Sequence, residues 1–347
     1  MNQPWVVTGN NHTDLSLKVD TELSAPDLKE SHIVISLSPT GFSVIVADEG
    51  KQNILLSAHK HWQEMILVEP LLKEFEKCLG LIPFPLSDAA SAQVLINYNK
   101  FSLVPEHLYE KEQGPKILSY TAKLTKGDHI YSDHWKGSEA ILVYACPLAI
   151  MEWIQKRFPN ASIAHAGTAM DKLMQIVPKS EQFAYLHIEP NTADFYLAKD
   201  GKLQWYNNFD FSTEEDLLYF ILYSLEQNRI LATELELHLS GHSLRGDKLQ
   251  ALLNRYIGTI KEMDLPLGFA LSSDISIQEL RENFNLIGLL WRELLAENFE
   301  VRLLRRPAPY QLDPPPTLLK RAYSTSSIII SILMRLRCLT SLREPVI

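Results

Sequence analysis

The sequence predicts a mixed α/β protein built from two similar halves with a cleft between them. The element order β-β-β-α-β-α can be read twice along the chain. The length of 347 residues exceeds that of a typical single domain, and a hydrophobic content of 46% excludes wholesale disorder. Two copies of one unit, with no residue-level repeat, therefore indicate a duplicated fold.

The first copy opens with three short strands separated by turn residues, which is typical of a meander. A helical stretch follows, and Pro70 within it should kink or split the helix because proline lacks an N–H. Residues 139–146 (EAILVYAC) form a near-continuous apolar run, typical of a strand buried on both faces. The predicted strands are 33–35, 42–47, 53–58, 94–97, 101–104 and 139–146, and the predicted helix is 62–79.

The second copy repeats this order. Asp200-Gly201 predicts a tight hairpin turn between its second and third strands. Ser212 and Glu215 have the spacing of a capping box and predict the start of a helix, whose apolar positions keep helical spacing. The predicted strands are 183–188, 193–198, 203–209 and 235–239, and a last helix carries apolar residues from 249 to 257.

Composition and charge limit the classes of function. The net charge of −9 argues against a nucleic-acid binder that acts through overall charge. Cys78, Cys146 and Cys338 form no CxxC motif, so no disulfide framework or zinc site is expected. The N-terminus has no apolar signal region, and the apolar run 328–334 is shorter than the ~20 residues that span a bilayer. We expect a cytoplasmic protein without a transmembrane segment.

Four segments are expected along the chain. Residues 1–29 are polar without sustained periodicity and predict an N-terminal arm, 30–179 and 180–290 are the two halves, and 291–347 hold a helix and a basic, Pro-rich tail.

The tail differs from the body in charge. Residues 302–347 hold eight Lys and Arg against two acidic residues, a charge of +6, whereas residues 1–301 carry −15. One interpretation is an arm that contacts an anionic surface, and the other is a disordered appendage.

Three segments carry a resemblance to a known superfamily: the hairpin of residues 33–46, residues 185–197 (YLHIEPNTADFYL) and residues 237–242 (LHLSGH). With the duplicated order, they resemble the actin-like ATPases, the superfamily of sugar kinases, Hsp70 and actin. The chain resembles more closely a Bacteroidota family with a domain of unknown function, and is similar to the actin-like proteins of pilus assembly and type II secretion. Over roughly residues 30–290, the resemblance implies a duplicated ribonuclease-H-like fold, two mixed-sheet halves around a cleft.

The resemblance also implies which residues line the nucleotide cleft. They are Ser36, Ser38 and Thr40 in the first phosphate loop, His187, Glu189, Asn191 and Thr192 in the second, and Ser240, Gly241 and His242 in the adenosine motif. Active members have a carboxylate at the end of the first strand of each half, with glycines beside it, for Mg²⁺ and phosphate. Here Ser36 and His187 stand at the carboxylate positions and Ser38 and Glu189 at glycine positions. A Glu189 side chain should repel a triphosphate.

These departures lead to the hypothesis of a pseudo-ATPase, an actin-like binding scaffold that does not hydrolyse ATP. No catalytic or metal-ligating residue is assigned and no cofactor is expected, with weak binding of ATP and Mg²⁺ left open. The partner would be an unidentified protein, a homodimer is left open, and no specific nucleic acid is predicted.

Two alternative functions stay open. The first is an active ATP-dependent phosphotransferase that uses carboxylates such as Asp48, Glu189 or Asp194. The second is an adaptor that contacts nucleic acid or a membrane through residues 302–347.

Several candidates also have a purely structural interpretation. Asn191 and Thr192 suit a turn between strands, and His187 suits a packed position on an alternating strand. The carboxylates Asp210, Glu214, Glu215 and Asp216 suit the positive end of a helix dipole, and a metal site is the less favoured interpretation.

Overall fold

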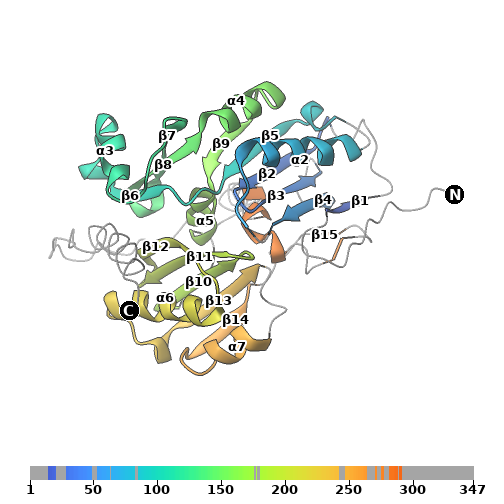
Figure 1. The fold of residues 1–347 in the computed structure, drawn as a ribbon. Coiled ribbons are helices and arrows are strands. Elements are labelled where there is room, and N and C mark those ends of the chain that lie inside the picture. The colour runs from blue at the N-terminus through green and yellow to red at the C-terminus, as the bar shows by residue number, and fades with distance from the viewer. Residues whose placement is uncertain are drawn as a thin grey trace, which may run out of the picture.

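The computed structural model contains two mixed β-sheets of the same topology, one in each half, and a smaller third sheet (Figure 1). It describes residues 15–20, 29–48, 53–62, 64–82, 85–175, 177, 180–241, 247–263, 270–271, 275–276, 281–287 and 289–290. The statements below concern these residues.

The first sheet has the order β1-β4-β3-β2-β5-β9, with β15 also paired to β4. Strands β2, β3 and β4 are antiparallel neighbours, and β5 and β9 join β2 in parallel. The strands are β1 (Ser16–Val19), β2 (His32–Ser38), β3 (Gly41–Ala47), β4 (Asn53–His61), β5 (Ser91–Ile96), β9 (Ser162–His165) and β15 (Ala270–Leu271).

The second sheet, β12-β11-β10-β13-β14, repeats this arrangement. Its first three strands are antiparallel neighbours, and β13 and β14 join β10 in parallel. The strands are β10 (Gln182–Ile188), β11 (Thr192–Lys199), β12 (Lys202–Asp210), β13 (Glu236–Gly241) and β14 (Thr259–Glu262). The predicted duplicated ribonuclease-H-like fold is thus confirmed by the strand order of both halves.

The third sheet, β6-β8-β7, is an insertion in the first half between the fourth strand, β5, and the helix that follows. Its strands are β6 (Phe101–Pro105), β7 (Asp128–Trp135) and β8 (Ala140–Pro147), and β8 is the strand predicted from the apolar run. Leu142, Val143 and Ala145 of β8 are fully buried, because the side chains of this central strand pack on both faces of the small sheet.

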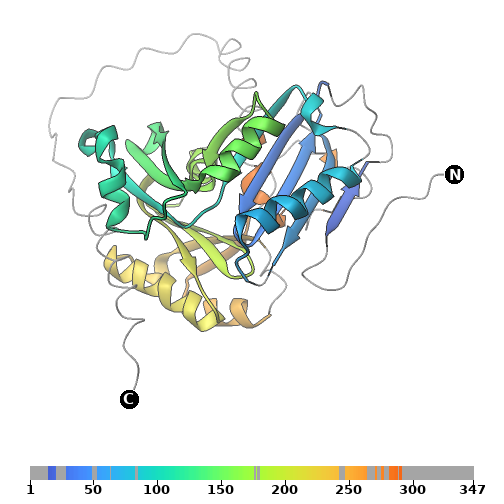
Figure 2. The same cartoon turned by 45° about the horizontal axis from the view of Figure 1, so that its top comes forward.

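Helices α2 (Val68–Leu81) and α4 (Leu148–Arg157) cover the outer face of the first sheet, and α6 (Glu214–Gln227) and α7 (Asp247–Leu253) cover that of the second (Figures 1 and 2). The α-helices are α2 (Val68–Leu81), α3 (Gly114–Ser119), α4 (Leu148–Arg157), α5 (Ala166–Met174), α6 (Glu214–Gln227) and α7 (Asp247–Leu253). Short 3₁₀ helices lie at Leu86–Asp88, Glu106–Leu108, Lys111–Gln113, Lys136–Ser138 and Ala232–Glu234. Among the described residues, none of these helices is long and apolar enough to cross a bilayer.

Both faces of the second sheet are buried, and each packs on a different neighbour. Its outer face packs under α6 and α7 through residues such as Leu186 and Phe195. Its inner face carries Tyr185, Tyr196 and Tyr206, and these side chains belong to the same apolar cluster as the core of the first half. Successive side chains of a strand point to opposite faces, so each strand of the second sheet can supply both cores. The inner-face side chains thus form one core together with the first half.

Tyr206 is the centre of this shared core. Its ring stacks on Phe101 at a centroid distance of 5.3 Å and lies edge-on to Trp135 at 5.2 Å. Helix α5 lies between the halves (Figure 1), and its Gly167 approaches the Tyr206 ring so closely that an added Cβ would lie 2.7 Å from Cε1. Glycine is needed here for close packing.

The side chain of His165 caps the N-terminus of α5. Its Nδ1 accepts a hydrogen bond of 3.0 Å from the backbone N–H of Gly167. Nδ1 is therefore the unprotonated nitrogen, and Nε2 donates to the carbonyl oxygen of Tyr98 at 3.1 Å. These two bonds fix α5, and Gly167 with it, against the end of β5.

Residues 270–271, 286–287 and 289–290, which belong to the predicted second half, pack against the first sheet. Strand β15 pairs with β4, and Leu286 and Ile287 share an apolar cluster with Val34 of β2. After β14 the chain thus returns from the second half to the first sheet. The predicted boundaries at residues 179 and 290 stay a prediction.

Three local expectations differ from the structure. Residues 16–19 lie in the predicted polar arm, yet they form β1, with Leu17 buried. Pro70 lies in the first turn of α2 and causes no kink, because an N–H at that position has no intrahelical acceptor. The N-cap of α6 is Thr213 with Asp216, not Ser212 with Glu215, so the capping box is shifted by one residue.

Gly167→Ala should lower the free energy of unfolding by about 1–3 kcal/mol, because the new methyl group overlaps the immobile Tyr206 ring. Urea denaturation measures the change. Gly127→Ala is the control, since an added Cβ there has no neighbour within 4 Å. Equal stability of the two variants would contradict the close packing of α5 on β12.

Candidate functional site

Two hairpins occupy equivalent places in the two halves. In the first, Ser38 pairs with Gly41 and Ser36 with Ser43. In the second, the N–H of Glu189 donates to the carbonyl oxygen of Thr192 at 2.8 Å, and His187 pairs with Asp194. Counting back from each turn, Ser36 corresponds to His187 and Ser38 to Glu189.

The side chain of Glu189 connects the two hairpins. Asn97 Nδ2 donates to Glu189 Oε1 at 3.1 Å, and the Thr192 hydroxyl donates to Oε2 at 3.3 Å. The hydroxyl of Thr40, in the first hairpin, also hydrogen-bonds the Glu189 carboxyl group. Ser38 Oγ lies 3.2 Å from Thr40 Oγ1. We call these five residues the Glu189 cluster.

Asn97 is well placed to hold this carboxyl group. It follows the last residue of β5, and its backbone N–H donates to the carbonyl oxygen of Leu37 at 2.8 Å. Two residues on, Asn99 Nδ2 donates to Asp210 Oδ2 at 3.0 Å. The end of β5 thus contacts the second half through two amide side chains.

Burial and, to a lesser extent, the nearby charge of Asp194 raise the pKa of Glu189 to about 7, against the lowering effect of the hydrogen bonds from Thr192, Asn97 and Thr40. Burial also raises the pKa of Asp194 to about 6, against the lowering effect of its hydrogen bonds. Asp194 Oδ1 accepts from the Tyr206 hydroxyl at 2.8 Å and from Asn208 Nδ2 at 3.1 Å. Both carboxyl groups therefore bind protons more tightly than exposed ones.

His187 lies in a row of polar side chains across the second sheet. Asn208, Asp194, His187 and Ser240 are direct neighbours on β12, β11, β10 and β13, and all four are buried. Since opposite residues of paired strands share a face, this row faces the first half, beside the tyrosines of the inner face.

The contacts of His187 are those of a packed residue. Its Nδ1 lies 2.8 Å from Ser240 Oγ, and burial lowers its pKa to about 4, so the ring is neutral near pH 7. Ser240 Oγ also lies 2.6 Å from the Tyr185 hydroxyl, which donates to Asn285 Oδ1 at 3.3 Å. The hydroxyl of Ser240 thus joins β13 to β10. The hydroxyl of Tyr185 in turn joins β10 to Asn285.

Gly241 has a backbone role that needs no ligand. Its φ of +101° is unfavourable for other residues, and an added Cβ would lie 2.0 Å from the carbonyl oxygen of Ile188. His242 lies outside the described residues. The carbonyl oxygen of Asn191 accepts from the N–H of Phe211 at 3.0 Å, which ties the hairpin to the end of β12.

Two predicted residues stay apart from the Glu189 cluster. Ser36 is half-buried on β2, and no contact with the second hairpin is found for it among the described residues. Asp48 follows the end of β3 remote from the hairpin and accepts a bond of 3.1 Å from the N–H of Asn53. The phosphotransferase alternative is left with Glu189 and Asp194.

Three residues around the predicted ones carry little signal in the local sequence. Asn97, Tyr206 and Asn208 were not singled out, because each gains its importance from a partner far away in the chain. One usable signal existed: a polar residue directly after a buried strand, as Asn97 follows β5, marks the carboxyl-end edge at which α/β sheets bind ligands.

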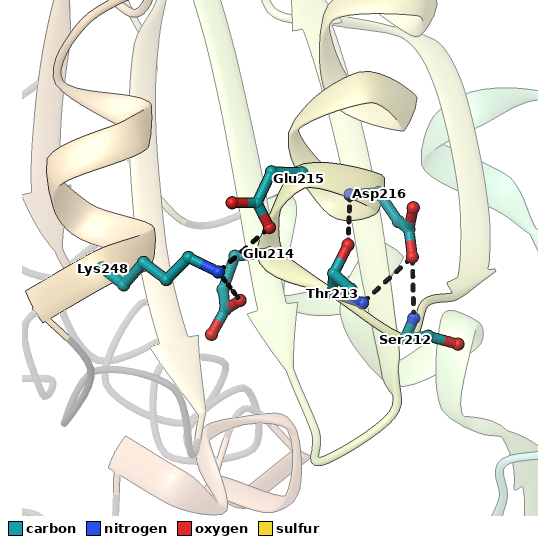
Figure 3. Close-up of polar contacts among 6 residues, drawn as sticks. All are labelled: Ser212, Thr213, Glu214, Glu215, Asp216 and Lys248. Carbon is teal, nitrogen blue, oxygen red and sulfur yellow. Dashed lines mark hydrogen bonds and ion pairs between the residues drawn. The ribbon is translucent and has the colours of Figure 1, made fainter.

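The acidic group at the start of α6 has a structural explanation (Figure 3). Asp216 Oδ2 accepts from the backbone N–H groups of Ser212 and Thr213, at 3.2 and 3.0 Å. Lys248 of α7 donates to Glu214 at 2.9 Å and to Glu215 at 3.1 Å. Across the part of the chain that the structure describes, no group of three or more His, Cys, Asp or Glu could hold a metal ion.

The described residues do not fit a magnesium triphosphate. A bound phosphate needs backbone amides free of side chains around it, but the Glu189 carboxyl group lies at the hairpin junction. Ser36 and His187 supply no carboxylate for the metal.

Glu189→Gln should alter how stability depends on pH. The folded-state pKa of about 7 lies above the ordinary value of 4.5, so the stability that the proton contributes is complete below pH 4.5 and is lost as the pH rises through 7. We expect both proteins to be equally stable at pH 5, and the variant to be more stable by about 2 kcal/mol at pH 8.

Urea denaturation between pH 5 and pH 8 measures this difference. Glu226→Gln, a change on the exposed side of α6, is the control and should follow the wild-type profile. Parallel profiles for Glu189→Gln and the wild type would contradict a half-buried Glu189 that binds a proton with a raised pKa.

Comparisons with known proteins agree with the geometry of the fold. A protein from Bacteroides thetaiotaomicron VPI-5482, described as having an actin-like ATPase fold and unknown function, is similar in structure with a TM-score of 0.65. The two sequences are 18% identical over 78% of this chain and 98% of that one. This similarity confirms the actin-like ATPase fold.

Two further structures have lower scores. The PilM–PilN type IV pilus biogenesis complex gives a TM-score of 0.47 and 13% identity, over 76% of this chain and 98% of that one. The cytoplasmic domain of EpsL, an inner membrane component of the type II secretion system of Vibrio cholerae, gives 0.38 and 13%, over 77% and 95%.

Sequence comparison identifies the family. No curated protein sequence matches the chain. The family model described as "Protein of unknown function (DUF3822)" matches residues 20–260, which is more than half of the sequence and includes strands β2 to β13. The chain therefore belongs to the DUF3822 family.

Proposed function

We propose that this protein is a non-hydrolysing, actin-like binding scaffold, a pseudo-ATPase whose cleft is held shut by its own side chains. The observation that carries the proposal is the position of the Glu189 carboxyl group, bonded to Asn97 and Thr40 of the other half. A related, active ATPase would need this space for phosphate.

The chemistry of the site supports this proposal. Phosphoryl transfer depends on metal ions that neutralise the developing charge and on exact positioning of the phosphate. An ionised Glu189 would repel phosphate oxygens, and a protonated one would still fill the space between the hairpins. His187, neutral and bonded to Ser240, supplies no negative charge for a metal.

The same contacts support a scaffold in which nucleotide is not needed to join the halves. The apolar core around Tyr206, the Asn99–Asp210 bond and the Glu189 cluster all connect the first half to the second. We propose that function lies in contacts of the outer surface with a protein partner in the cytoplasm. Its identity would come from an unbiased pull-down with the full chain.

Isothermal titration of the full chain with MgATP tests the proposal, together with an assay for phosphate release. The wild type should give neither saturable binding nor phosphate. Glu189→Gly, which removes the side chain from the junction, should bind MgATP more tightly than the wild type but still release no phosphate, because Ser36 and His187 supply no metal ligand. Asp200→Gly, an acid-to-glycine change in an exposed turn at positive φ, is the matched control and should behave as the wild type.

Micromolar binding of MgATP by the wild type, with phosphate release, would overturn the scaffold and favour the phosphotransferase alternative. That alternative has one observation in its favour, since Glu189 and Asp194 lie close enough for the charge of one to raise the pKa of the other. An Asp194→Asn variant that kept the activity would then exclude this pair as the catalytic carboxylates.

A further inference from the structure

The outward face of α6 carries two stacked tyrosines, of which Tyr219 is exposed and Tyr223 is half-buried. Tyr219 is 59% exposed, and its ring stacks on that of Tyr223, one helical turn later, at a centroid distance of 5.9 Å and an interplanar angle of 16°. Glu215 and Glu226 continue this row at its two ends, because residues three and four apart are neighbours on a helix. We call these four residues the α6 outer face.

Core packing does not explain the exposed tyrosine. The opposite side of α6 already supplies the core contacts, through Leu217, Ile221 and Leu225, all at most 1% exposed. Aromatic side chains that are large, stiff and tipped with a hydroxyl group are enriched at binding surfaces. Tyr219 therefore has the character of a contact residue, and Tyr223, which also packs against the core of the second half, supports the Tyr219 ring from below.

The charge of this face is acidic at both ends. At the N-terminal end Lys248 is shared between Glu214 and Glu215, so one negative charge is left over (Figure 3). At the C-terminal end Glu226 is exposed, and no ion pair with it is found within the described ranges. The sequence of residues 180–263 holds thirteen acidic and seven basic residues, a charge of −6.

One segment of the same chain complements this face. Residues 328–339 (IIISILMRLRCL) combine apolar side chains with Arg335 and Arg337, within a C-terminal stretch whose charge is +6. Apolar side chains can cover the tyrosine rings, and arginine favours the faces of aromatic rings and carboxylates.

The chain is long enough for this contact. The last described residue, Leu290, is buried against the first sheet. The residues from there to Ile328 can span up to about 120 Å when extended, at ~3.3 Å a residue. A folded body of this size has a diameter of about 50 Å, so every part of its surface is within reach.

We propose that residues 328–339 bind the α6 outer face of the same molecule. The bound segment covers Tyr219 and Tyr223 and places its arginines beside Glu215 and Glu226. The C-terminal stretch is then an internal ligand of the second half. This contact is independent of whether the cleft binds nucleotide.

A native thiol allows a direct test in the full chain. Cys338 lies in the proposed ligand, while Cys78 and Cys146 are buried, which raises the pKa of each thiol to about 12 and keeps them unreactive. Glu226→Cys places a second thiol at the edge of the face and leaves both tyrosines intact. Tyr256→Cys, in the same half at a side chain that is 47% exposed, is the matched control.

In the Glu226→Cys variant, mild oxidation should form a disulfide between Cys338 and position 226 within one molecule. This disulfide should form at least tenfold faster than the disulfide to position 256 in the Tyr256→Cys variant. Peptide mapping of the monomer measures both rates. When Arg335→Glu and Arg337→Glu are combined with Glu226→Cys, the rate of disulfide formation should fall to that of the Tyr256→Cys control. Equal rates at both positions, or no link at 226, would overturn the proposal. Linked dimers would also overturn it and would identify a second copy as the occupant of the face.

Discussion

The inner face of the second sheet cannot be left in water, and much of the molecule follows from this constraint. Tyr185, Tyr196 and Tyr206 are buried side by side on it, and the first half, with α5, supplies their cover. Each sheet of a mixed α/β fold needs two packed faces, but the helices of the second half cover only one. The hydrophobic effect therefore holds the two halves together independently of the polar contacts between them.

The tyrosines also explain the polar row beside them. A buried hydroxyl group needs a hydrogen-bond partner, and the neighbouring row supplies Asp194 for Tyr206 and Ser240 for Tyr185. Asp194 and His187 lie at positions that suggest chemistry, yet each is engaged by a structural partner. Burial then shifts their pKa values, so these shifts follow from packing and are no evidence of catalysis by themselves.

The sequence predicted what depends on local pattern and missed what depends on distant partners. The strands of both meanders were found because their apolar runs are long and bounded by turns. Strands β1, β9 and β14 were missed, because each has only four residues and at most one of them is buried. Strand β7 was missed for a similar reason, since its side chains are half-exposed on a small sheet. For the site, Glu189 was found through its hairpin, but its bond to Asn97, 92 residues earlier, has no local signature.

Strand β1 has a consequence for how the molecule behaves in a crowded solution. An edge strand offers a row of free N–H and C=O groups to which another chain can add. On the first sheet that edge would be β4, but β1 covers residues 56–59 and β15 covers residues 53–54. Strand β1, which has only four residues, thus replaces the nine-residue β4 at this edge and offers a shorter row of free groups. A shortened chain that begins at residue 30 would lose Leu17 from the core of the first half and would expose residues 56–59 of β4 as a hydrogen-bonding edge through which molecules can self-associate.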